Sequence, residues 1–171
     1  PYTTLSRSLR RARVLLEART LAELARTELA IEVLAAETGP DVERLRADVY
    51  WRGKRWREAG EAYEKALGDR HVGGQPLDDT ERGDAVRAAV AYALSSDRLG
   101  LDRFRTKFLA KMSDSPDAET FRLVTLDSLS RADAFRETAR NVVSAQTLGD
   151  FLDAYRKRYP DSLGGKREAK G

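Results

Sequence analysis

The stretch ADVYWRGKRWREAGEAYEKAL, residues 47–67, contains two short helical patterns separated by a turn. Small and large apolar residues recur in the second pattern, where Ala59, Tyr63 and Ala66 have the three- and four-residue spacing of one helix face. Gly53 and the two basic residues after it supply a tight turn between the patterns. The stretch therefore predicts two antiparallel helices that meet through small side chains.

This stretch resembles a tetratricopeptide repeat, a family of helical hairpins that stack into a right-handed solenoid. The residues that carry the resemblance are a tyrosine before the turn, an aromatic residue after it and an Ala, Tyr, Ala series, namely Tyr50, Trp56, Ala59, Tyr63 and Ala66. The resemblance implies a binding scaffold rather than a catalyst. It also implies a concave groove, lined by the first helix of each hairpin, in which a segment of a partner protein binds.

The rest of the chain predicts further helices and no strand, because proline and glycine are scarce and apolar residues recur every three or four positions. The pair of Ala47 and Tyr50 has an echo at Ala89 and Tyr92. We expect an all-α solenoid of about three hairpins with C-terminal capping helices. The expected layout is one domain over residues 1–159, hairpins at about 5–36, 42–67 and 79–112, capping helices at about 116–159 and a disordered tail at 160–171.

Capping residues predict where individual helices begin and end. Gly39 and the proline after it end one helix, and Asp41 is expected to cap the next. The returning helix of the second hairpin is predicted over Trp56–Leu67. Asp78, or one of the two residues after it, should cap the following helix, and Pro116 should occupy the first position of a later one.

The resemblance also points to candidate partner-binding residues. Carrying the groove-facing positions of the family onto this sequence gives Arg44, Asp48, Trp51 and Arg52 in one hairpin and Arg19 in the hairpin before it. A tryptophan with two arginines would suit an extended peptide that bears a carboxylate. The competing interpretation is that Trp51 packs on the neighbouring hairpin and that the arginines form a solvated helix face.

The charge balance leaves two further functions open. Lysine and arginine number 31 against 28 acidic residues, so the net charge of +3 does not by itself imply nucleic-acid binding. The first alternative function is a structural domain that self-associates through an apolar C-terminal helix, residues 148–159. The second is nucleic-acid binding through arginine-rich helix faces, above all Arg7, Arg10, Arg11 and Arg13, although no aromatic residue lies among them to stack on a base.

The sequence contains few residues that could carry out catalysis. The chain has no cysteine and a single histidine, His71, which lies in a predicted loop and is expected to be solvated. No zinc-protease helix, phosphate loop or nucleophile elbow occurs. We therefore expect no enzymatic activity, no cofactor, no metal and no small-molecule substrate, and we expect a protein or peptide partner.

The sequence gives only a broad expectation for the cellular setting. No apolar run approaches the roughly 20 residues that a membrane-spanning helix requires. Arginine and alanine are abundant, as is typical of proteins encoded by GC-rich bacterial genomes, and the first residue is Pro1 rather than methionine. We expect the soluble region of a larger bacterial protein, in either the cytoplasm or the periplasm.

Overall fold

The computed structural model describes residues 2–130, and within them the side chains of residues 6–125. Over residues 2–130 the chain forms seven α-helices and no strand, which confirms the all-α prediction. The predicted tail and most of the predicted capping region lie outside the described residues. The helices are α1 (Tyr2–Glu23), α2 (Thr27–Val33), α3 (Pro40–Arg52), α4 (Trp56–Leu67), α5 (Asp79–Leu94), α6 (Arg98–Ser113) and α7 (Ala118–Ser130).

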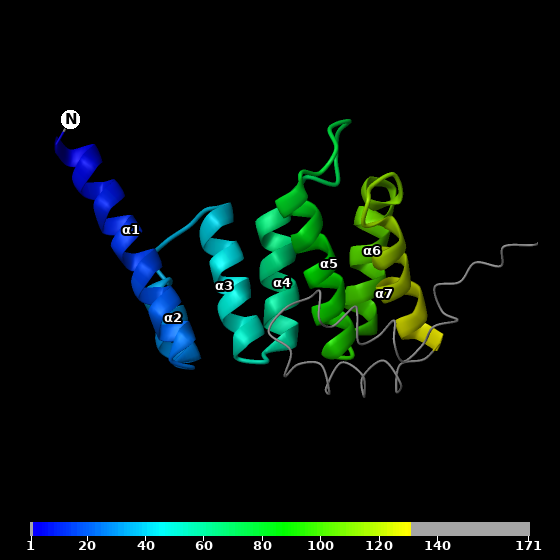
Figure 1. The fold of residues 1–171 in the computed structure, drawn as a ribbon, viewed down its shortest axis with the longest axis horizontal. Helices are drawn as coiled ribbons and strands as arrows, with labels where there is room; N and C mark the ends of the chain where they lie inside the picture. The colour runs from blue at the N-terminus through cyan, green and yellow to red at the C-terminus, as the bar shows by residue number, and fades with distance from the viewer. Residues whose placement is uncertain (1, 131–171) are drawn as a thin grey trace, which may run out of the picture.

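The described helices stand side by side in a row that follows their order along the chain (Figure 1). Helix α4 packs closely against both α3 and α5, while α5, α6 and α7 pack on one another at one end. At the other end of the row, α1 contacts α2 and α3. The segment between α4 and α5 projects beyond the ends of the helices (Figure 1).

The pairs α1–α2, α3–α4 and α5–α6 are joined by turns of the same form. The middle residue of each turn has a left-handed backbone, with φ angles of 57°, 58° and 62° at Ala25, Lys54 and Ser96. The amide N–H of the next residue donates to the carbonyl oxygen five positions earlier, at distances of 2.8–3.1 Å. This is the hydrogen bond that closes a helix in the Schellman motif. The three pairs therefore share one turn geometry.

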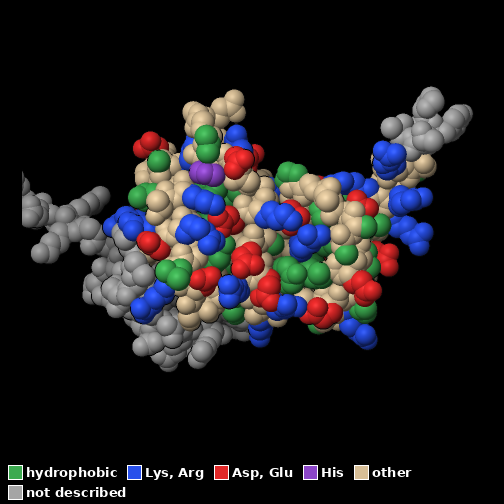
Figure 2. Space-filling model, turned by 180° about the vertical axis from the view of Figure 1, so that it is seen from behind, with side chains coloured by type: hydrophobic (Ala, Val, Ile, Leu, Met, Phe, Trp, Pro, Cys, Tyr) green, Lys and Arg blue, Asp and Glu red, His purple; other side chains and the backbone are tan. Residues whose placement is uncertain are grey.

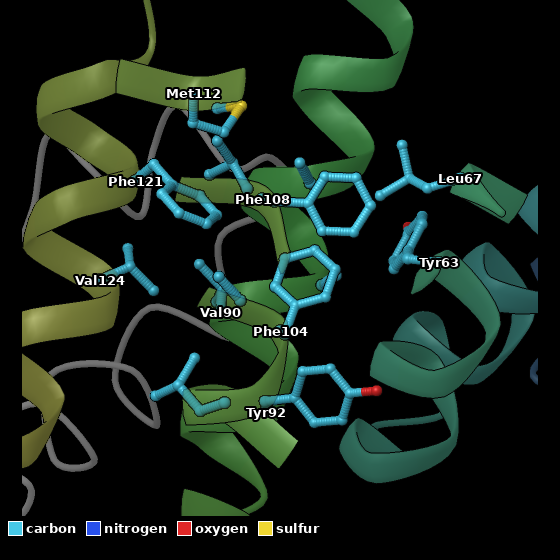
Figure 3. Close-up of a cluster of buried hydrophobic side chains, with 14 of the residues drawn as sticks. Tyr63, Leu67, Val90, Tyr92, Phe104, Phe108, Met112, Phe121 and Val124 are labelled. Atoms are coloured by element: carbon cyan, nitrogen blue, oxygen red, sulfur yellow. The ribbon is translucent and has the colours of Figure 1, made fainter. Parts of the chain in front are cut away.

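The larger of two hydrophobic cores, called the main core below, lies between α4, α5, α6 and α7 (Figure 3). Its centre is Phe104, whose ring centroid lies 4.8 Å from that of Phe108, 5.9 Å from that of Tyr92 and 6.2 Å from that of Phe121. Each of these side chains is fully buried, and each such burial contributes roughly 2 kcal/mol. A second core joins α1, α2 and α3 through Ala18, Ala22, Ala30, Leu34, Val42, Leu45 and Val49.

The predicted cap of α5 is confirmed and is the first of its three candidates, Asp78, whereas two other predicted helix starts are wrong. The Asp78 side chain accepts a hydrogen bond from the amide of Glu81, whose own side chain accepts from the Asp78 amide. Helix α3 begins at Pro40 rather than after Asp41. The Asp41 carboxylate instead accepts a hydrogen bond from Arg11 on α1, at 2.7 Å. This long-range ion pair takes the side chain away from the cap position.

Pro116 does not occupy the first position of a helix, because α7 begins at Ala118. The Ser115 hydroxyl accepts a hydrogen bond from the amide of Asp117 at 3.2 Å, and the Ser115 amide donates to the Met112 carbonyl oxygen. These bonds close a separate turn after α6. The Ser-Pro pair therefore belongs to that turn and not to the helix that follows.

The close approach of α4 to α5 predicts that replacing glycine by alanine has opposite effects on stability at Gly60 and at Gly83. A Cβ atom at Gly60 would lie 3.2 Å from ring atoms of Tyr92, a buried side chain that has little room to move. A Cβ atom at Gly83 would meet nothing within 4 Å. We expect Gly83→Ala to stabilise the protein by about 0.5–1 kcal/mol and Gly60→Ala to destabilise it by about 1 kcal/mol, as measured by urea unfolding.

Because alanine has the same intrinsic advantage over glycine at both positions, the difference between the two variants isolates the contact with Tyr92. Equal stabilisation by both substitutions would contradict the packing of α4 against α5 described above.

Candidate partner-binding surface

The predicted groove residues of α3 do not share one environment. Arg44, Asp48 and Trp51 each contact a residue of α4 or α5, whereas Arg52 is exposed and pairs with no acidic side chain within residues 6–125. Arg19, on α1, is likewise exposed and unpaired over that range. The structure therefore brings three of the five predicted residues into contacts between helices and leaves two arginines in solvent.

Arg44 is held across the space between α3 and α5 by a buried carboxylate. Its Nε atom donates to Oδ2 of Asp84 at 2.5 Å, and Asp84 is wholly buried. The two terminal amino groups of Arg44 have no hydrogen-bond partner in the described part of the chain, and the side chain is 30% exposed. The ion pair thus fixes the guanidinium while leaving its outer donors open to solvent or to a ligand.

A second arginine approaches the same carboxylate from α5 itself. Nη1 of Arg87 lies 3.8 Å from Oδ1 of Asp84, too far for a hydrogen bond, and the Arg87 side chain is 41% exposed. Oδ1 of Asp84 is buried and accepts no hydrogen bond from any described residue. Burial raises the pKa of Asp84 above its ordinary value, against the opposing effect of the hydrogen bond from Arg44.

Asp48 lies near enough to Asp84 for its charge to raise the pKa of that carboxyl group, and it pairs with Tyr63 on α4. The Tyr63 hydroxyl donates to Oδ1 of Asp48 at 2.5 Å, and the ring of Tyr63 belongs to the main core. Burial raises the pKa of Tyr63, as does the neighbouring carboxylate, so the hydroxyl remains a donor at neutral pH. We call Arg44, Asp48, Tyr63, Asp84 and Arg87 the Asp84 cluster, because that carboxylate lies at its centre.

Trp51 contributes to helix packing. Its ring lies edge-on to Trp56, with 5.2 Å between centroids, and to Tyr63, with 6.3 Å between centroids. The indole is half-buried against the main core. Both ring contacts are with α4, in the hairpin of Trp51 itself, and the core against which the indole packs also contains residues of the neighbouring hairpin.

Asp84 and Arg87 were not among the residues predicted from the sequence. The available signal was the position of Asp84, which shares a helix face with Ala88 and Ala91 at i, i+4 and i+7, all of them buried. A charged residue on a buried face needs an oppositely charged or hydrogen-bonding partner. The sequence could have shown that Asp84 needs one, but not that the partner is Arg44.

His71 was expected to be solvated, but its side chain is only partly exposed. Its residue is half-buried, its ring lies 5.6 Å from that of Phe108, and Nδ1 is buried without a hydrogen-bond partner among the described residues. The side chain therefore packs the loop onto α6.

No cluster of three or more residues suited to hold a metal ion occurs in the region described. None of the helices described here has the length and apolar character needed to cross a membrane.

Comparisons with known proteins add no relative. No family model matches the chain, and neither does any curated protein or any solved structure.

The burial of Asp84 predicts how protein stability depends on pH. Because the pKa is raised in the folded protein above the ordinary 3.8, the proton stabilises the fold below that value, and this contribution is lost as the pH rises through the folded-state pKa. Asp84→Asn removes the titrating group. We expect the unfolding free energy of the wild type to fall relative to that of the variant as the pH rises above about 4, as measured by urea unfolding at each pH.

A constant offset between the two proteins is expected because an amide packs and forms hydrogen bonds differently from a carboxyl group, so only the change with pH is diagnostic. If the wild type gained stability relative to Asp84→Asn as the pH rose, Arg44 would outweigh the cost of burial, and the direction of the pKa shift would be wrong.

Proposed function

We propose that this chain is a protein-interaction module of the tetratricopeptide type, a right-handed solenoid that binds an extended segment of a partner along the face formed by α1, α3 and α5. The recurrence of one turn geometry in three successive hairpins supports the repeat architecture. The row of helices in Figure 1 has the order that stacked hairpins require. The function involves no catalytic step.

The observation that carries this proposal is the ion pair that holds Arg44 against buried Asp84. A solvated arginine must lose side-chain freedom when it binds a ligand, whereas Arg44 is already fixed through Nε, with its outer amino groups unoccupied among the described residues. A surface that is ordered before binding loses less entropy in the complex. The Asp84 cluster therefore favours a ligand that brings hydrogen-bond acceptors to Arg44.

The chemistry of the ligand follows from the charges at this surface. The charges of Arg44 and Arg87 balance those of Asp48 and Asp84, and exposed Arg52 adds one positive charge. Arg52 lies eight residues after Arg44, which is about 12 Å along the helix axis. An extended peptide can span this distance in about four residues. We propose a peptide with at least one carboxylate, which binds one or more of Arg44, Arg52 and Arg87. Its backbone carbonyl oxygens accept hydrogen bonds from the arginine donors that the carboxylate leaves free.

Selection from a phage-displayed library of random peptides tests this proposal. Peptides that bind the full chain should be enriched in aspartate and glutamate. Each charge-assisted hydrogen bond that is lost should weaken binding by about 1.5–3 kcal/mol, or roughly tenfold or more. We expect Arg52→Gln and Arg87→Gln to weaken the selected peptides to this extent, as measured by fluorescence anisotropy.

Two further variants make the result specific to the surface. Arg44→Lys keeps the charge beside Asp84 but removes the forked donor, and should also weaken binding. Arg98→Gln is the matched control, because Arg98 is an exposed arginine on α6 with no ion pair to any described residue. Selected peptides that bind the Arg44, Arg52 and Arg87 variants as tightly as the wild type would rule out this surface. So would a library that yields no binding peptide.

A further inference from the structure

Helix α1 has apolar side chains on two opposite sides, and only one side is covered by described residues. Ala18 and Ala22 are buried on the inner side, where they belong to the smaller core. On the outer side, Leu9 is 63% exposed and Leu16 is 62% exposed, with exposed Ala12 between them. Exposed leucines that align on one helix commonly mark a contact surface.

The three residues form one line along the helix. Leu9, Ala12 and Leu16 are related by i, i+3 and i+7, so their side chains lie above one another on a single face. This is the spacing of the contact positions in a pair of packed helices. Figure 1 shows α1 at the end of the row, with no described helix beyond it. The outer side of α1 therefore has the pattern of a helix that packs on another helix.

The charges beside this line are mostly positive and unpaired. Arg13, four residues after Leu9, and Arg19, three residues after Leu16, lie next to the line, and both are exposed and form no ion pair with any described residue. Arg11, which points to the inner side, forms ion pairs with Asp41 and with Glu37. Basic side chains accordingly gather at the end of the molecule that α1 forms (Figure 2). The unpaired charges indicate a partner that carries acidic side chains beside its own apolar line.

A second copy of this chain does not satisfy these charges. An antiparallel pair with Leu9 opposite Leu16 has its midpoint between residues 12 and 13, which brings the two copies of Arg13 together. A parallel pair places every arginine beside its own copy. A lipid surface would need a wider apolar face than one line of leucine and alanine, and Glu17 lies beside that line. A nucleic-acid backbone would leave the leucines uncovered.

We propose that the outer side of α1 binds an amphipathic helix of a partner protein, with apolar residues at i, i+3 and i+7 and with aspartate or glutamate flanking them. The leucines supply the buried contact, and the arginines select the acidic partner and fix its register. This surface is separate from the Asp84 cluster on α3, α4 and α5. It therefore adds a second contact point to the module and does not depend on binding at the first.

Synthetic peptides of about three heptads test this proposal with the full chain. One peptide has leucines at the contact positions and glutamates on both flanks, and a second has lysines in place of the glutamates. Fluorescence anisotropy should show binding of the glutamate peptide at least tenfold tighter than that of the lysine peptide. The affinity for the glutamate peptide should fall as salt concentration rises, because the arginines are exposed.

Variants of the full chain separate the apolar contact from the charges. Leu9→Ser with Leu16→Ser should weaken the glutamate peptide at least tenfold at any salt concentration. Arg13→Gln with Arg19→Gln should weaken it and flatten its salt dependence. Leu99→Ser is the matched control, since Leu99 is 85% exposed on α6, and it should leave binding unchanged. These are exposed positions, and circular dichroism checks that every variant keeps its helices.

Four results would overturn the proposal. The first is equal binding of the two peptides, and the second is binding of the glutamate peptide that the leucine variants do not weaken. The third is a dimer in sedimentation equilibrium that Leu16→Ser abolishes, which would assign the surface to a second copy of the chain. The fourth is binding of duplex DNA or anionic lipid vesicles that is tighter than binding of the glutamate peptide.

Discussion

The packing of α4 between α3 and α5 is the constraint on which the rest of the described structure depends. Three alanines on α4, Ala59, Ala62 and Ala66, are buried and small enough to let the neighbouring helices approach closely. The same helix carries Tyr63, which reaches Asp48 on α3 while its ring enters the main core. The spacing that α4 imposes on its neighbours allows Arg44 to reach Asp84, and so sets the geometry of the proposed binding surface.

Local features of the sequence predicted much of this arrangement. The bounds of α4 agree with those predicted, and Asp78 caps α5, because both depend on residues within one or two turns. Asp41 was assigned to the wrong position because its side chain pairs with Arg11, which is distant in the sequence. The left-handed residues of the hairpin turns, such as Lys54, were not anticipated, because glycine is the usual residue at that position.

The candidate site was less predictable than the fold. The family resemblance identified Arg44 and Asp48 as groove residues, but it gave no indication that Asp84 would hold Arg44 in place. Opposite charges 40 positions apart can pair only once helix packing has brought them together, and many other arginines were available to Asp84. The same limit applied to Trp51, whose contacts with α4 depend on how closely the two helices pack.

The exchange of the Nε proton of Arg44 with solvent, followed by nuclear magnetic resonance, tests the central claim most directly. If buried Asp84 holds Arg44 across α3 and α5, the proton that Nε donates should exchange far more slowly than the equivalent proton of exposed Arg52. Arg44→Lys identifies the resonance by removing it, and Asp84→Asn should abolish its protection. Exchange at Arg44 as fast as at Arg52 in the wild type would contradict the account, because the guanidinium would then be free in solution.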